Sequence, residues 1–113
     1  MQLCSTRRAV LLAALALPLS AAAALAQETT IQIAVKDKRF EPSEIRAPAG
    51  KPIVIRIKNN DAKAIEFESH AMKVEKVIAP GAEGTVRVRA LKPGRYEFMD
   101  DFNQSNRGTL VVE

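Results

Sequence analysis

The segment EFESHAMKVEK, which begins at Glu66, gathers side chains that can bind metal ions. Its first seven residues contain two carboxylates, the only histidine of the chain and a methionine, all at alternate positions. Alternate side chains of an extended chain share one face. If the segment is extended, one row therefore contains Glu66, Glu68, His70 and Met72, while Phe67 points the other way.

A second segment with chemical potential, MDDFN, begins at Met99, directly after the strand-like pattern Tyr96-x-Phe98. By the same alternation, Asp100 shares the core-facing side of Phe98, while Met99 and Asp101 face the opposite way. Burying a carboxylate in an apolar interior costs free energy unless a cation or hydrogen-bond donors compensate its charge. We therefore expect Asp100 to have a partner.

Carboxylate oxygens, one imidazole and thioethers together suit iron or copper better than calcium, which prefers oxygen ligands alone. A structural zinc site would need cysteines or more histidines. Each residue also has an explanation without metal, because exposed acids are usually solvated, methionines often fill cores and a lone histidine often makes only a surface hydrogen bond. The combination is more informative than its members, and the candidate metal ligands are Glu66, Glu68, His70, Met72, Met99, Asp100 and Asp101.

The first 26 residues have the pattern of a cleaved secretory signal peptide. Arg7 and Arg8 precede the apolar stretch AVLLAALALPLSAAAALA, and Ala24-Leu25-Ala26 fits a cleavage site. A transmembrane helix is the alternative, but Pro18 and the alanine-rich end favour cleavage. We expect a periplasmic protein whose single domain covers residues 27–113, exported by the general or the twin-arginine route and without stable membrane insertion.

The composition of residues 27–113 excludes several classes of function. This part keeps all but two of the 17 basic residues against 13 acidic ones, a net charge near +2, with no basic run and few aromatic residues. Nucleic-acid binding therefore has little support. The only cysteine, Cys4, lies in the signal, so the mature chain has no thiolate for metal binding or nucleophilic chemistry. Hydrolysis is disfavoured too, since no serine is framed by glycines.

The elements that must position these residues are strands. Apolar and polar residues alternate over 30–35, 52–58 and 85–89, with Ile53, Ile55 and Ile57 on one face, and Thr109–Val112 is a short closing strand. Clusters of glycine, proline and asparagine separate these runs at spacings typical of short antiparallel strands. The pattern predicts an all-β sandwich of about seven short strands with Greek-key connections.

The order of short motifs resembles the cupredoxin-like domain over nearly the whole mature chain. The motifs are Phe40-x-Pro42, Pro48-Ala49-Gly50, Asn59-Asn60-Asp61, Glu66-Phe67-Glu68, Pro80-Gly81, Lys92-Pro93-Gly94-x-Tyr96-x-Phe98 and Gly108-Thr109-Leu110-Val111-Val112. In blue-copper members, the resemblance places histidine, cysteine, histidine and methionine ligands at or near Glu66, Asp100, Asn103 and Asn106. Because every ligand is replaced here, the sequence predicts that no blue-copper centre forms.

The substituted pattern resembles the cupredoxin-like component of bacterial periplasmic ferrous-iron uptake systems. That resemblance implies binding of iron, copper or both and assistance to ferrous-iron oxidation, beside a second periplasmic metal-binding protein and an inner-membrane permease. As a hypothesis, Glu66 and Asp100 bind iron, while His70, Met72 and Met99 form a softer copper site. Two alternatives remain open: a carrier that does not oxidise its metal, and a metal-free interaction module on the same scaffold.

Overall fold

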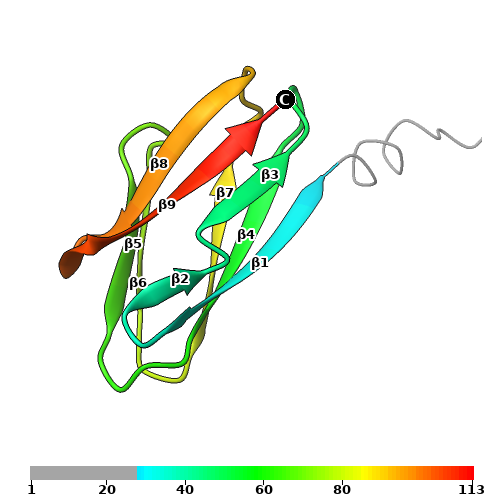
Figure 1. Cartoon of the computed structure of the whole chain (residues 1–113). Helices are drawn as coiled ribbons and strands as arrows, with labels where there is room; N and C mark the ends of the chain where they lie inside the picture. Colours follow the sequence, from blue (N-terminus) through cyan, green and yellow to red (C-terminus); the bar gives the residue numbers. More distant parts are fainter. Residues whose placement is uncertain (1–27) are drawn as a thin grey trace, which may run out of the picture.

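The computed structural model describes residues 28–113, which form nine β-strands in two sheets (Figure 1). The strands are β1 (Thr29–Lys36), β2 (Arg39–Glu41), β3 (Glu44–Ala47), β4 (Ile53–Asn59), β5 (Ile65–Ser69), β6 (Val74–Ile78), β7 (Glu83–Val88), β8 (Gly94–Asp100) and β9 (Asn103–Val112). The predicted all-β sandwich is confirmed. The predicted signal peptide, residues 1–26, lies outside the described residues.

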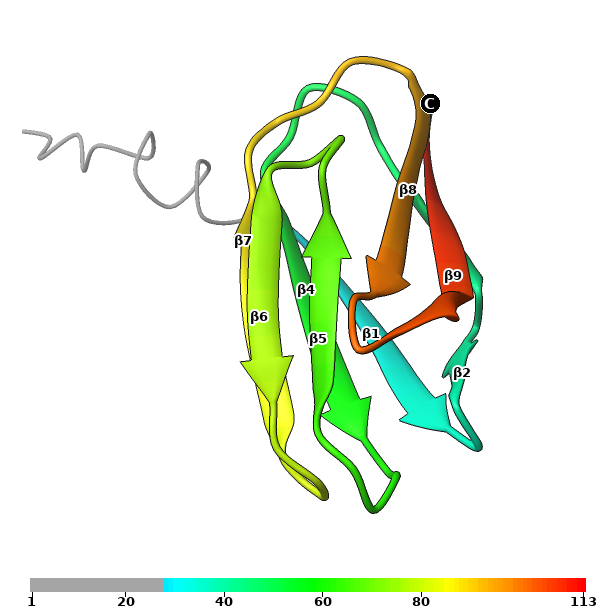
Figure 2. The same ribbon diagram turned by 90° about the vertical axis from the view of Figure 1, so that its left-hand side faces the viewer.

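The four-stranded sheet has the order β2-β1-β4-β7, and the five-stranded sheet has the order β3-β9-β8-β5-β6. Figure 2 shows β6, β5 and β8 side by side in that order. The prediction of about seven strands was too low, because the chain around Pro42 forms two short strands, β2 and β3, one in each sheet. Proline lacks a backbone N–H and so ends the first of them.

The core lies between the sheets and follows from the alternation of apolar residues. Ile53, Ile55 and Ile57 are all buried, as the pattern of β4 predicts. Phe98 stacks on Phe67 with ring centroids 5.1 Å apart and meets Phe40 edge-on at 5.0 Å. Since Phe40 belongs to the opposite sheet, this aromatic group joins the two layers.

Hydrogen bonds from two side chains organise the loops at the end of the sandwich where β4 ends. Asp37 and Lys38, in the β1–β2 turn, have φ values of 51° and 62°. Both of their backbone N–H groups donate to the Asp61 carboxylate, at 2.8 Å each. Asn59 is fully buried and binds the segments on either side of the β5–β6 hairpin. The motif Asn59-Asn60-Asp61 is therefore structural.

Within residues 28–113, no helical segment has the length and hydrophobicity of a membrane span.

Candidate metal centre

Strand β5 carries the first part of the predicted row. Glu66 and Glu68 are half-buried on the outer face of the five-stranded sheet, and Phe67 is buried on the inner face. The prediction that the row continues through His70 to Met72 is wrong, because β5 ends at Ser69. The Ser69 hydroxyl donates to the Glu97 carbonyl at 2.6 Å and accepts the Met72 N–H at 3.1 Å, which starts the turn.

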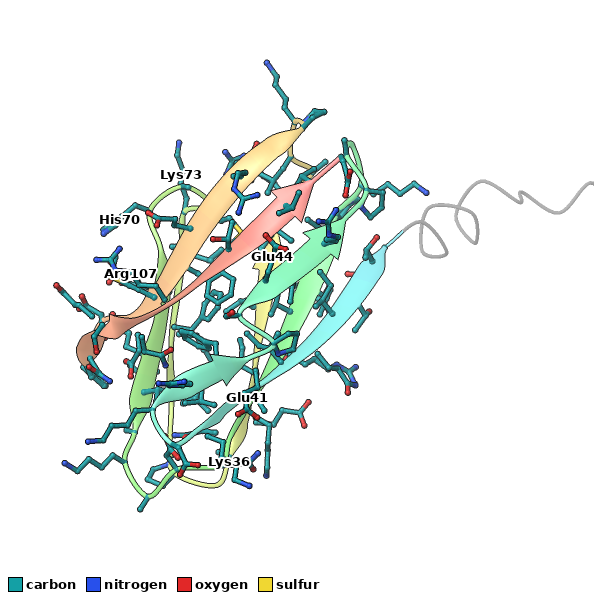
Figure 3. All side chains as sticks on the ribbon, viewed as in Figure 1. Lys36, Glu41, Glu44, His70, Lys73 and Arg107 are labelled. Carbon is teal, nitrogen blue, oxygen red and sulfur yellow. The ribbon has the colours of Figure 1, made fainter. Side chains whose placement is uncertain are left out.

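The turn separates the two soft ligand candidates. Met72 is 1% exposed and belongs to the hydrophobic core, where its apolar neighbours leave no room for a hydrated ion. His70 lies on the turn next to Lys73 (Figure 3), and its side chain is 78% exposed. Its Nε2 is 3.5 Å from Glu68 Oε1. The structure therefore does not assemble the hypothetical copper site of His70, Met72 and Met99.

Two consecutive aspartates, the last residue of β8 and the residue after it, face opposite sides of the sheet. Asp100 is 4% exposed and lies on the side of Phe98, as the alternation predicts, while Asp101 is exposed. The expected partner of Asp100 consists of backbone N–H groups: its Oδ1 accepts from Glu66 and from Phe102, at 3.0 Å each. Met99 is half-buried and lies opposite Glu68 in the β5–β8 pairing.

Three of the predicted residues come together. Glu66, Glu68 and Asp101 each offer a carboxylate oxygen, and these atoms lie within 4.8 Å of one another. Backbone pairing creates this cluster, because the N–H of Asp101 donates to the carbonyl of Glu66 at 2.9 Å. We call Glu66, Glu68 and Asp101 the carboxylate cluster.

The three carboxylates of the cluster repel one another. Burial, followed by the negative charge of Asp101, raises the pKa of Glu66. Burial and then the negative charge of Asp101 likewise raise the pKa of Glu68, and His70 partly offsets this rise. A bound cation would favour the ionised form of both carboxyl groups and so oppose this rise in pKa.

Sequence reasoning missed Glu75, which also raises the pKa of both Glu66 and Glu68. It lies on β6, directly opposite Glu68 in the β5–β6 pairing. The signal was present in the sequence: a short turn between two strand-like runs sets the register of a hairpin and so brings Glu75 across from Glu68. Glu75 extends the acidic surface around the cluster.

The donor set decides which metals the cluster fits. Oxygen-only, anionic ligands suit hard cations, which include calcium, magnesium and manganese as well as ferric iron, so these three residues, unlike the full candidate set, do not disfavour calcium. The positions that a blue-copper centre would use do not fit one, because they carry Glu66, Asp100, Asn103 and Asn106. Asn106 is buried, and its Oδ1 accepts the N–H of Phe40 at 3.0 Å, so it serves the packing between β2 and β9.

Comparisons with known proteins agree with the observed fold. An uncharacterised protein of Rickettsia prowazekii (strain Madrid E) is 35% identical over 83 residues, which cover 73% of this chain and 66% of that protein. The chain thus spans just under two thirds of that relative's length.

Two solved structures have similar folds. The metal-binding domain of a Cu(I)-exporting P-type ATPase of Streptococcus pneumoniae gives a TM-score of 0.68 at 19% identity, over 77% of this chain and 87% of that domain. Auracyanin A, a "blue" copper protein of Chloroflexus aurantiacus, gives 0.65 at 19% identity, over 76% and 99%. The sequence model described as "Cupredoxin-like domain" matches residues 8–112. The chain belongs to the cupredoxin-like domain family.

Proposed function

We propose that this protein binds iron at Glu66, Glu68 and Asp101 and assists the oxidation of ferrous iron before its uptake. The observation that carries the proposal is the carboxylate cluster, with three ligand oxygens within 4.8 Å on a solvent-accessible sheet face. The resemblance of the Glu66-Phe67-Glu68 motif to cupredoxin-like components of iron-uptake systems supports the same role.

The chemistry follows from the charge and type of the donors. Three anionic oxygens stabilise ferric iron more than ferrous iron, because the higher charge interacts more strongly with carboxylates. Binding at this face therefore lowers the free energy of the oxidised product and favours loss of an electron to an acceptor such as dioxygen. The exposed face leaves room for the acceptor and for release of the product.

Copper remains part of the proposal as a second substrate or partner ion. His70 lies beside Glu68, and Met99 lies opposite Glu68, so an imidazole and a thioether flank the cluster. Met72 is no longer proposed as a ligand, because its side chain is in the core. The structural relatives named above bind copper by their own descriptions, which supports testing copper alongside iron.

The proposed setting is the periplasm. The signal-peptide pattern of residues 1–26 supports export, by the general or the twin-arginine route. The proposed partners are a second periplasmic metal-binding protein and an inner-membrane iron permease, which would take the ion that this protein releases.

The test uses purified metal-free protein. Ferrous iron is added in air, with and without an equimolar amount of copper, and ferric iron is followed against a protein-free control. We expect acceleration by the wild type, and a loss of at least about tenfold in affinity and rate in Glu68→Gln and Asp101→Asn. Glu97→Gln is the matched control, because Glu97 is an exposed acid on β8, the strand that precedes Asp101, and lies outside the cluster.

The outcomes separate the proposed function from its alternatives. Binding without acceleration would identify a carrier, and the oxidation step would be withdrawn. No binding of either metal would leave an interaction module on a cupredoxin-like scaffold. Equal losses in Glu97→Gln and in the cluster variants would mean that general surface charge, not the cluster, attracts the ion.

A further inference from the structure

Asp100 is a buried carboxylate that the carboxylate cluster does not include. It is 4% exposed and is the last residue of β8. Its Oδ1 accepts two backbone N–H groups at 3.0 Å each, one from Glu66 and one from Phe102.

The two donors stand at the two segments that form the cluster. Glu66 is itself a cluster residue on β5, and Phe102 directly follows the cluster residue Asp101. A single oxygen atom of Asp100 therefore holds the strand that carries two of the carboxylates and the turn that carries the third. The Asp101 N–H, donating to the Glu66 carbonyl at 2.9 Å, completes the junction.

The backbone hydrogen bonds between β5 and the end of β8 are too few and too irregular to fix the relative position of these two segments on their own. The β5–β8 pairing contains only two register pairs, Phe67 with Asp100 and Glu68 with Met99. On the other side of β8, the pairing with β9 shifts register between Met99 and Asp100. At this junction the Asp100 side chain accepts one N–H from β5 and one from the turn after β8, in addition to the backbone pairing.

We propose that Asp100 is a positioning residue, whose Oδ1 fixes the separation of Glu66 and Asp101 and thereby sets the cation affinity of the cluster. The inference rests on the proposed metal site, but the constraint itself is a property of the metal-free protein. It replaces the earlier hypothesis that Asp100 binds iron together with Glu66. An amide oxygen can accept the same two N–H groups, so position rather than charge is the property that matters.

The test compares Asp100→Asn with Asp100→Ala. Amide hydrogen exchange of Glu66 and Phe102 is measured by NMR in the metal-free protein, and Co²⁺ binding is measured by titration as a probe that air does not oxidise. We expect Asp100→Asn to keep both amides protected and to bind Co²⁺ within about threefold of the wild type. In Asp100→Ala we expect exchange of both amides to accelerate, and Co²⁺ affinity to fall, by about tenfold or more.

Two results would overturn the proposal. If Asp100→Asn loses Co²⁺ binding as completely as Asp100→Ala while its amides stay protected, the charge of Asp100 acts directly on the metal. If Asp100→Ala leaves both amides protected, Oδ1 does not hold the junction. Should Asp100→Ala fail to fold, amide exchange and Co²⁺ binding of Asp100→Asn alone show whether the position of the oxygen or the charge of Asp100 sets the cation affinity. If the wild type binds no metal, the exchange data still test the constraint, so failure of the proposed function remains distinguishable.

Discussion

Hydrogen bonds from Asn59 connect the turn after β4 to both ends of the β5–β6 hairpin. That hairpin carries Glu66, Glu68 and the neighbouring acid Glu75. Its side chain is fully buried. Its Nδ2 donates to the carbonyls of Lys63, Ile78 and Ala79 at 2.8, 3.2 and 3.3 Å. Its Oδ1 accepts the N–H of Asp61 at 3.0 Å. We predict that Asn59→Ala destabilises the whole domain.

The size of the effect follows from the groups that alanine would leave. Since Nδ2 has two hydrogens, the side chain makes about three effective hydrogen bonds, each with a net contribution of about 1 kcal/mol. Part of this junction is buried, so polar groups without partners add to the cost. Asn59→Ala should therefore lower the free energy of unfolding by about 2–4 kcal/mol. In a domain of this size that corresponds to a fall in Tm of roughly 10–25 °C.

Urea unfolding followed by far-UV circular dichroism measures this difference. The matched control is Asn60→Ala, because Asn60 is exposed and its backbone N–H, which alanine keeps, donates to the Val35 carbonyl. We expect a change within about 0.5 kcal/mol in the control. Asn59→Asp retains the size and Oδ1 of the side chain but presents an acceptor to three carbonyls, so it should be at least as damaging as alanine. A loss below about 1 kcal/mol in Asn59→Ala, or a mild Asn59→Asp, would refute the argument.

Three further variants test the core, the cluster and one close backbone approach. Met72→Leu should lower the free energy of unfolding, measured with urea, by less than about 1.5 kcal/mol, because Met72 fills the core. The metal affinity measured by titration should stay the same, and a loss of metal binding would mean that Met72 is a ligand after all. Burial and the neighbouring carboxylates raise the pKa of Glu68 above its ordinary value of 4.5, so its ionisation costs stability as pH rises through the folded-state pKa. Glu68→Gln should therefore show a higher Tm than the wild type at neutral pH and no difference below about pH 4, and the opposite order would contradict this. A Cβ at Gly108 would clash with the Phe98 ring, so Gly108→Ala should lower the free energy of unfolding by about 1–3 kcal/mol or more. Gly94→Ala, whose nearest contact would be 3.5 Å, should be almost neutral.

The fold was predictable because the strands of this chain have regular binary patterns. In β4, isoleucine alternates with polar residues over most of its length, and the predicted buried face is the observed one. The short strands β2 and β3 were not predictable in the same way, because three or four residues cannot show a period. Their pairing depends on long-range partners, β1 for β2 and β9 for β3.

The site was predictable only as far as the alternation of β5 continues. Alternation placed Glu66 and Glu68 on one face, but it could not show that the strand ends at Ser69. That end depends on the Glu97 carbonyl, which accepts the Ser69 hydroxyl across 28 positions of sequence. The Ser69 hydroxyl also accepts the Met72 N–H. Met72 is buried in the core whereas His70 is exposed, so two ligand candidates of the same row have opposite environments.

Asp100, at the end of β8, and Asp101, the next residue, face opposite sides of the five-stranded sheet. Strand alternation sends Asp100 inward, where a charge must be satisfied, and the nearest donors are backbone N–H groups. The next residue, Asp101, faces outward, where the half-buried Glu66 and Glu68 supply further oxygens. A cation bound at the cluster, as proposed, would reduce the mutual repulsion of these acids without entering the aromatic core beside Phe98. In the proposed function, the inner carboxylate therefore sets the geometry and the outer carboxylates supply the charge, so substitutions at Asp100 and Asp101 should have different chemical requirements: an acceptor oxygen at the first and a negative charge at the second.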